Sequence, residues 1–244
     1  MPINHIDGLE MKNLARAEFP HSLIHRRDVS HNFWREYGLR LFNARYVWGI
    51  LASLGVFFLL VALTNVNRPW SFESSILLYL HAYATSSLDR LAVLISASVA
   101  VASVAILVYL IYRRSWRVTA FLLASTAGVE VITRIAKVFF HHSRPQLWDV
   151  ISHQTSFAFP SGHATQSMAL VLALIVIFYS RPHRLVQILA GALFIIVVAF
   201  SRMYLGLHFP TDILAGWALA MAWVCMLALI FKKAEPALGM GRAI

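Results

Sequence analysis

The sequence predicts an all-α fold, a bundle of six transmembrane helices. Of its 244 residues, 59% are hydrophobic and only 13% are charged, and the mean hydropathy is +0.67. A soluble domain of this length needs more charge than that to cover its surface, so the composition indicates a protein of the lipid bilayer.

Six apolar runs of helical length define the expected spans. A helix crosses the hydrocarbon core with about 20 residues, at a rise of about 1.5 Å each. The shorter runs need their flanking residues to complete the crossing. The first run begins too far along the chain for a cleaved signal peptide, so we expect it to remain as an anchor. The runs are residues 46–63, 91–112, 118–140, 164–179, 185–200 and 213–231.

The distribution of Lys and Arg sets the expected orientation. If the N-terminus is cytoplasmic, 15 of the 21 basic residues fall in inner segments, as the positive-inside rule requires. Both termini are then cytoplasmic, and the outer ends of helices three to six face the periplasm or the exterior. The net charge of +10 does not indicate nucleic acid binding, because the basic residues punctuate apolar runs and form no single patch.

Three regions follow from this pattern. Residues 1–45 form a basic cytoplasmic segment, residues 46–232 form the membrane domain, and residues 233–244 form a short cytoplasmic tail. In the first region Phe33 and Tyr37 are four residues apart, with Arg35 off that line. This spacing predicts an amphipathic helix lying on the inner membrane surface.

Nearly all the unusual polar residues fall at the outer ends of helices three to six. Ionisable residues at membrane depth are costly, so a cluster of them indicates a functional site. Packing of the helices brings these distant positions to one pocket. The candidate residues are Lys137, Arg144, Ser161, Gly162, His163, Arg202, His208 and Asp212.

The residue types in this cluster suit a phosphate group. Lys137, Arg144 and Arg202 supply three positive charges, enough to bind a dianionic phosphate without a metal ion. Ser161 and Gly162 precede a helix, whose free N–H groups and positive dipole end attract anions. Gly162 also lacks a side chain where a phosphate has to approach the backbone.

Two histidines and one carboxylate add chemistry to the expected pocket. His208 and Asp212 are four residues apart, so the carboxylate can hold the imidazole in one tautomer. His163 is a second imidazole, able to protonate a departing alkoxide. Taken singly, such residues are more often interfacial anchors, helix caps or solvated side chains. Their conjunction on one side of the membrane favours a catalytic site.

These residues resemble the motif of the type 2 phosphatidic acid phosphatase (PAP2) superfamily. The first block is Lys137, six residues, then Arg144-Pro145, and the second is Pro160-Ser161-Gly162-His163. The third is Ser201-Arg202, five residues, His208, three residues, then Asp212. All three blocks are complete and in order, over about a third of the chain.

The resemblance implies a membrane lipid phosphatase of the bacterial cell membrane that needs no cofactor. By likeness, His208 attacks phosphorus and forms a phosphohistidine, with Asp212 orienting it and His163 protonating the leaving oxygen. The phosphate-binding residues implied are Lys137, Arg144, Ser161, Gly162 and Arg202. The substrate implied is a lipid phosphate monoester or diphosphate, of the phosphatidate, phosphatidylglycerophosphate or undecaprenyl diphosphate class.

Other polar residues near the pocket are given lesser roles. Glu130 and Arg134, four apart on helix three, predict an intramembrane ion pair. The group His141, His142, Asp149 and His153 matches no metal-ligand signature, so we expect no metal site and assign these residues to loop or substrate contacts. Tyr204 and Phe209 are candidates for the lipid entrance.

Two other functions remain open at this stage. A phosphohistidine can pass its phosphate to a lipid hydroxyl, which would make the protein a phosphotransferase. A transporter or scaffold could use the basic pocket only to bind an anionic headgroup, although transporters place such charges at mid-membrane. Neither the particular lipid nor the oligomeric state follows from the sequence.

Overall fold

The computed structural model describes the backbone of residues 22–64, 70–149, 154–178 and 183–237, and side chains from residue 43 to residue 231 within those ranges. The chain divides into two units, Met1–Ala44 and Arg45–Ile244. Within the described residues the first unit contributes only the beginning of one long helix. The second unit contains every other helix and all the predicted site residues.

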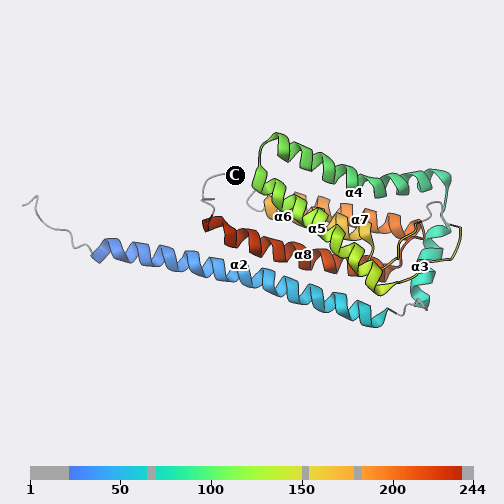
Figure 1. The fold of residues 1–244 in the computed structure, drawn as a ribbon, viewed down its shortest axis with the longest axis horizontal. Helices are drawn as coiled ribbons and strands as arrows, with labels where there is room; N and C mark the ends of the chain where they lie inside the picture. The colour runs from blue at the N-terminus through green and yellow to red at the C-terminus, as the bar shows by residue number, and fades with distance from the viewer. Residues whose placement is uncertain (1–21, 65–69, 150–153, 179–182, 238–244) are drawn as a thin grey trace, which may run out of the picture. The chain divides into compact units, whose positions relative to one another are not determined.

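All regular structure in the described residues is α-helical, which confirms the predicted all-α class (Figure 1). Three of the described helices precede the predicted site region, the long α2, the short α3 and α4, and the site residues lie on or between the four that follow. The helices are α2 (Ser22–Leu63), α3 (Ser71–His81), α4 (Ser86–Tyr112), α5 (Trp116–Phe140), α6 (Gly162–Ile177), α7 (Arg184–Tyr204) and α8 (Pro210–Ala237).

Five described segments are long and apolar enough to cross a bilayer: Asn43–Leu63, Ser86–Tyr112, Trp116–Phe140, Arg184–Tyr204 and Pro210–Phe231. The protein is therefore a multi-pass membrane protein. Each of the six apolar runs read from the sequence lies on one helix, but α6 has only 16 residues, shorter than a complete span.

The predicted interfacial helix is continuous with the first span. Residues 22–63 form one helix of 42 residues, with no break between the basic segment and the apolar run. The side chains of Phe33, Tyr37 and Arg35 lie outside the described residues, so the amphipathic face stays a prediction.

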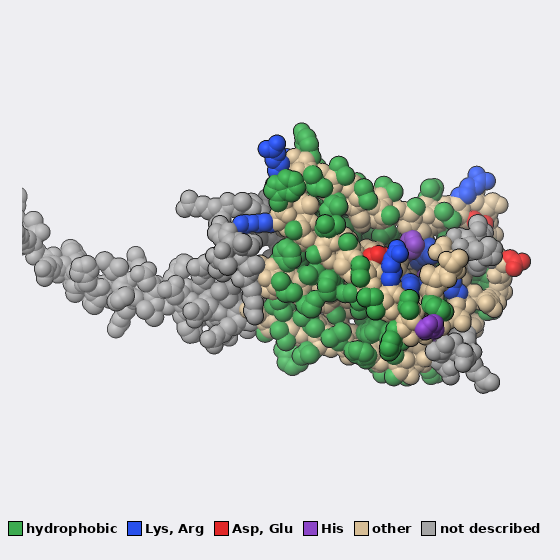
Figure 2. Space-filling model, in the orientation of Figure 1, with side chains coloured by type: hydrophobic (Ala, Val, Ile, Leu, Met, Phe, Trp, Pro, Cys, Tyr) green, Lys and Arg blue, Asp and Glu red, His purple; other side chains and the backbone are tan. Residues whose placement is uncertain are grey.

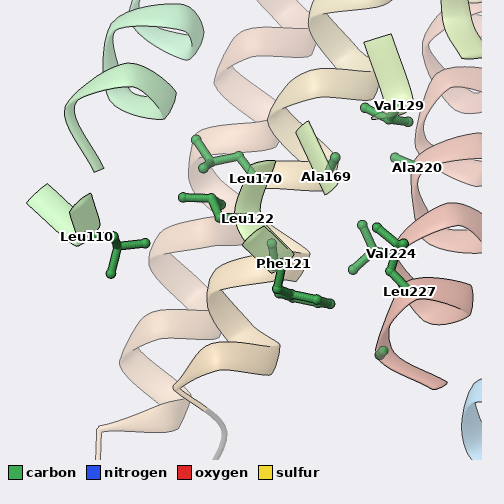
Figure 3. Close-up of a cluster of buried hydrophobic side chains, with 11 residues drawn as sticks. Leu110, Phe121, Leu122, Val129, Ala169, Leu170, Ala220, Val224 and Leu227 are labelled. Atoms are coloured by element: carbon green, nitrogen blue, oxygen red, sulfur yellow. The ribbon is translucent and has the colours of Figure 1, made fainter. Parts of the chain in front are cut away.

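The short helix α6 lies at the centre of the second unit. It packs against α4, α5, α7 and α8. Figure 3 shows the apolar cluster at this junction, where Leu122 and Val129 of α5 meet Ala169 of α6 and Val224 of α8. Lipid tails are as apolar as these side chains, so close packing and not water exclusion stabilises the contact.

Helices α6 and α8 approach each other most closely at Gly216. A Cβ atom built on Gly216 would lie 2.6 Å from Thr165 Oγ1 and 2.9 Å from the carbonyl oxygen of Ser161. Only glycine fits at this contact. The contact places the start of α6 directly beside the first turns of α8, where two of the motif blocks lie.

Contacts between loops close the end of the bundle that contains the predicted site. Trp148, in the loop between α5 and α6, stacks on His81 of α3 with ring centroids 4.0 Å apart. Gly206, with φ +67°, turns the chain between α7 and α8, and a Cβ there would lie 2.6 Å from the Trp148 ring. The left-handed backbone and the nearby indole both require glycine.

The Gly216 contact predicts a matched pair of substitutions. Gly216→Ala forces a methyl group into the α6–α8 interface and is expected to cost about 1–3 kcal/mol, as overpacking usually does. Gly55→Ala, where a new Cβ meets no atom within 4 Å, adds helix propensity without a clash. Thermal unfolding in detergent should show a lower Tm for the first variant only. Equal Tm values would contradict the close approach.

Candidate active site

The first part of the site is the pair formed by His208 and Asp212. His208 precedes α8 and Asp212 lies in its first turn, which Pro210 begins. The Nδ1 atom of His208 lies 3.5 Å from Oδ2 of Asp212. The backbone N–H of Phe209 donates to the same oxygen at 2.9 Å. Asp212 is 0% exposed and His208 1%, so both groups are removed from water.

Arg144 reaches the opposite side of the His208 ring. Its Nη1 atom lies 3.3 Å from His208 Nε2 and donates to the carbonyl oxygen of Leu207 at 2.9 Å. Its Nε atom donates to the carbonyl oxygen of Ser156 at 2.8 Å. A guanidinium can only donate, so it favours the tautomer with an unprotonated Nε2 and a proton on Nδ1, facing Asp212.

The start of α6 is tied to the start of α8. The backbone N–H of Ser161 donates to the carbonyl oxygen of Asp212 at 2.9 Å. The first N–H groups of a helix have no partner within the helix, so Gly162 and His163 present free donors here. The half-buried side chain of His163 lies in this first turn. Two motif blocks distant in sequence therefore meet at one point.

The other two cations approach from α5 and α7. Lys137 Nζ donates to the carbonyl oxygens of Phe157 and Ala158, in the loop before α6. Arg202 Nη1 donates to Ser96 Oγ of α4 at 3.1 Å. Both side chains are buried. A buried cation is costly unless it is paired or meets an anion.

Several polar groups at this end have capacity for a ligand. Within the described part of the chain, Ser161 Oγ and Arg202 Nε are buried without a hydrogen-bond partner. A Cβ built on Gly162 would meet no protein atom within 4 Å, so that position is open. Buried donors and an open glycine fit an anion better than a closed core. Figure 2 shows basic and histidine side chains gathered on one part of an otherwise largely hydrophobic face.

The surroundings of His208 determine its charge. Burial lowers the pKa of His208 well below its ordinary value of 6.5, because the charged ring is poorly solvated. The Asp212 carboxylate opposes this shift, whereas Arg202 and Arg144 reinforce it. Burial also lowers the pKa of Arg144, with Asp212 opposing. The resting site thus holds a neutral imidazole between a carboxylate and a guanidinium.

Sequence reasoning missed Glu73 and gave His142 only a role in loop or substrate contacts. Glu73 of α3 is 1% exposed, and its Oε1 accepts hydrogen bonds from the N–H and the hydroxyl of Thr211 at 3.1 and 2.6 Å. It caps the N-terminus of α8 across the bundle. His142 lies with Nδ1 3.2 Å from Asp212 Oδ1. The only available signal was an isolated acidic residue in an apolar outer segment, and a histidine close to a motif block.

The predicted ion pair of α5 is confirmed. Arg134 Nε lies 2.7 Å from Glu130 Oε1, and Gln166 of α6 donates to the other carboxylate oxygen at 3.0 Å. Arg134 is 76% exposed on the side of the bundle.

The remaining predicted residues have different surroundings. His141 and Asp149 are exposed, and His153 lies outside the described residues. Tyr204 donates to Asp89 Oδ1 at 2.8 Å, which ties α7 to α4. The Phe209 side chain is buried beside His142.

The fold and the site define a multi-pass helical membrane protein with a cluster of basic residues and histidines at one end of its bundle. Residues 118–236 match the model of the PAP2 superfamily. This match confirms the resemblance carried by the three motif blocks.

Sequence relatives are named phosphatases. Phosphatidylglycerophosphatase B of Bacillus subtilis (strain 168) is 32% identical over 117 residues, which cover 45% of this chain and 56% of that protein. An undecaprenyl-diphosphatase of Sulfolobus acidocaldarius is 26% identical over 132 residues, 52% of this chain and 61% of that protein. The chain thus aligns with little more than half the length of these relatives.

Two solved structures share the fold. A transmembrane PAP2-type phosphatidylglycerolphosphate phosphatase from Bacillus subtilis superposes with a TM-score of 0.66 at 21% identity, covering 80% of this chain and 100% of that chain. The Aquifex aeolicus LpxE structure gives a TM-score of 0.53 at 19% identity, covering 67% and 96%. At these identities the likeness concerns the fold alone.

The site predicts how His208 titrates. Because burial lowers its pKa, the neutral ring should persist at pH 6.5 and gain a proton only as the pH falls further. NMR of ¹⁵N-histidine-labelled protein, with the His208 signal assigned by its loss in His208→Ala, measures this midpoint. Asp212→Asn removes the charge that opposes the shift, so it should lower the midpoint further. A midpoint above 6.5 in the parent protein would contradict the buried, neutral ring.

Proposed function

We propose that the protein is a membrane lipid phosphatase, which removes a phosphate from a lipid phosphate monoester or diphosphate through a phosphohistidine intermediate. The observation that carries this proposal is the position of His208. Its Nδ1 atom faces Asp212, and its Nε2 atom faces the guanidinium of Arg144. A phosphate bound by Arg144 would therefore lie next to Nε2. The relatives are all named as phosphatases, which supports the same reaction class.

In the first step Nε2 of His208 attacks phosphorus. A P–N bond forms as the P–O bond to the lipid breaks, and His163 gives a proton to the departing oxygen. Asp212 stabilises the charge that develops on the imidazole ring through Nδ1–H. In the second step water attacks phosphorus, the P–N bond breaks, and His163 takes the proton from the water.

The phosphate-binding set supplies charge stabilisation. Lys137, Arg144 and Arg202 neutralise the oxygens of the phosphoryl group, and Ser161 with the Gly162 N–H completes the cradle. The contact between Arg144 Nη1 and His208 Nε2 is long, at 3.3 Å, and therefore weak. When a phosphate binds, Nη1 turns to the phosphate and leaves Nε2 free to attack. Three fixed cations perform the neutralisation that a divalent metal performs in other phosphatases, so we propose a reaction without a metal cofactor.

We further propose six membrane spans, with α6 as the shortest, in a bacterial cell membrane. Both termini are cytoplasmic and the site is periplasmic or extracellular. The support is the inner placement of 15 of the 21 basic residues. Three of the other six basic residues, Lys137, Arg144 and Arg202, belong to the proposed site. When these three are set aside, the share of basic residues on the inner side is larger still.

The substrate class is tested by phosphate release from purified protein in detergent. The panel contains phosphatidate, phosphatidylglycerophosphate, undecaprenyl diphosphate and lipid A phosphates, each in the presence of a chelator. We expect release from at least one lipid and none from His208→Ala, which should remain folded.

Three results would count against the proposal. Undiminished release by His208→Ala would remove the nucleophile. A requirement for added metal would contradict neutralisation by cations alone. Phosphate recovered on a lipid acceptor, without free phosphate, would make the protein a phosphotransferase.

Sidedness is tested by cysteine labelling in a Cys225→Ala background. Ser143→Cys, in the exposed loop after α5, should react with an impermeant thiol reagent in cells whose outer membrane alone is permeabilised. Ser115→Cys, at the other end of α5, should react only after lysis. The reverse pattern would place the site in the cytoplasm.

A further inference from the structure

A second imidazole faces the buried carboxylate of the site. His142 Nδ1 lies 3.2 Å from Asp212 Oδ1, while His208 Nδ1 lies 3.5 Å from Oδ2 of the same side chain. All three side chains are buried. The carboxylate thus lies between two histidines, only one of which belongs to the family motif.

The backbone after α5 places His142 in this position. His141 ends the helix in the left-handed conformation, with φ 52°, and its side chain points outward while that of His142 is buried. The N–H of Ala158 donates to the carbonyl oxygen of His142 at 2.8 Å. The rings of Phe159 and Phe209 flank the imidazole, with centroids 6.0 and 6.3 Å away. The imidazole is therefore held by the backbone and by packing.

The two oxygens of Asp212 have different partners. Oδ2 receives the N–H of Phe209 and faces His208, whereas Oδ1 faces His142. A carboxylate held through one oxygen can still rotate about its Cβ–Cγ bond. A donor on the other oxygen fixes its plane, and this keeps Oδ2 directed at Nδ1 of His208. Buried carboxylates require such donors on both oxygens.

We propose that His142 is a positioning residue: its Nδ1–H holds Oδ1 of Asp212, so that Oδ2 keeps the Nδ1–H tautomer of His208. This inference rests on the proposed function, in which His208 attacks through Nε2. In this inference His142 contacts Asp212 and does not contact the substrate. The consequence is that His142 acts on the rate of the chemical step and not on substrate binding.

The test compares three substitutions. His142→Ala removes the donor and should lower kcat by about 10- to 100-fold, the loss typical when a residue that orients a catalytic group is removed. His142→Asn keeps an amide donor near the Nδ1 position and should recover most of the activity. His142→Gln carries its amide one bond further, near the Nε2 position, and should not. KM should change little in all three variants.

The controls separate positioning from general damage. His183→Ala removes an exposed imidazole just before the first residue of α7, whereas Arg202 of the site lies in the last turn of that helix. This variant should leave kcat unchanged. If His142→Ala fails to fold, the Asn and Gln variants still decide. Equal activity of these two variants, or a raised KM with unchanged kcat, overturns the inference.

A second measurement does not depend on turnover. In ¹⁵N-histidine spectra the parent protein should show His208 with its proton on Nδ1, and His142→Ala should populate the other tautomer. An unchanged His208 tautomer overturns the inference even if the lipid panel shows phosphatase activity. A parent protein inactive on every lipid would refute the proposed function, while this tautomer shift would still measure the positioning contact.

Discussion

The whole site depends on one buried carboxylate at the start of α8. Asp212 is 0% exposed, and a charged group in such a place has to be surrounded by donors. The N–H of Phe209 donates to Oδ2, and the Nδ1 atoms of His208 and His142 lie 3.5 and 3.2 Å from Oδ2 and Oδ1. The backbone carbonyl oxygen of Asp212 also accepts the N–H of Ser161. The surroundings of this one residue therefore bring together His208, His142 and the start of α6.

A second constraint is the concentration of positive charge around that carboxylate. Lys137, Arg144 and Arg202 are all partly or fully buried. Their hydrogen bonds go to carbonyl or hydroxyl oxygens and, for Arg144, also to the neutral ring of His208, and none of these groups carries a charge. One carboxylate does not balance three cations. The excess positive charge is stabilised only by the dipoles of the surrounding backbone carbonyl groups. A phosphate dianion entering the site would compensate this charge. Burial lowers the pKa of His208, and the positive charges of Arg202 and Arg144 reinforce the shift, so the ring stays neutral.

The sequence was sufficient for the all-α class and for the family motif, because apolar runs and motif spacing are local signals, but it did not predict the short helix α3. Contacts between segments distant in sequence were not predictable. Glu73 reaches Thr211 only because α3 folds across the start of α8, and nothing near Glu73 in the sequence indicates that partner. His142 was grouped with its neighbour His141, although the left-handed turn at His141 sends the two side chains in opposite directions. The amphipathic spacing predicted a helix before the first apolar run, but nothing in the sequence pattern predicted that a single helix, Ser22–Leu63, would contain both segments.

The central claim is that Nε2 of His208 becomes phosphorylated. The most direct measurement is rapid mixing of purified protein with a phosphorus-32-labelled lipid substrate, followed by quenching in base, where phosphohistidine survives, and mapping of the labelled peptide by mass spectrometry. The account predicts label on the peptide containing His208, formed as fast as the lipid product appears, and none in His208→Ala. Label on His163 or His142, or steady turnover with no labelled protein at any time, would contradict it.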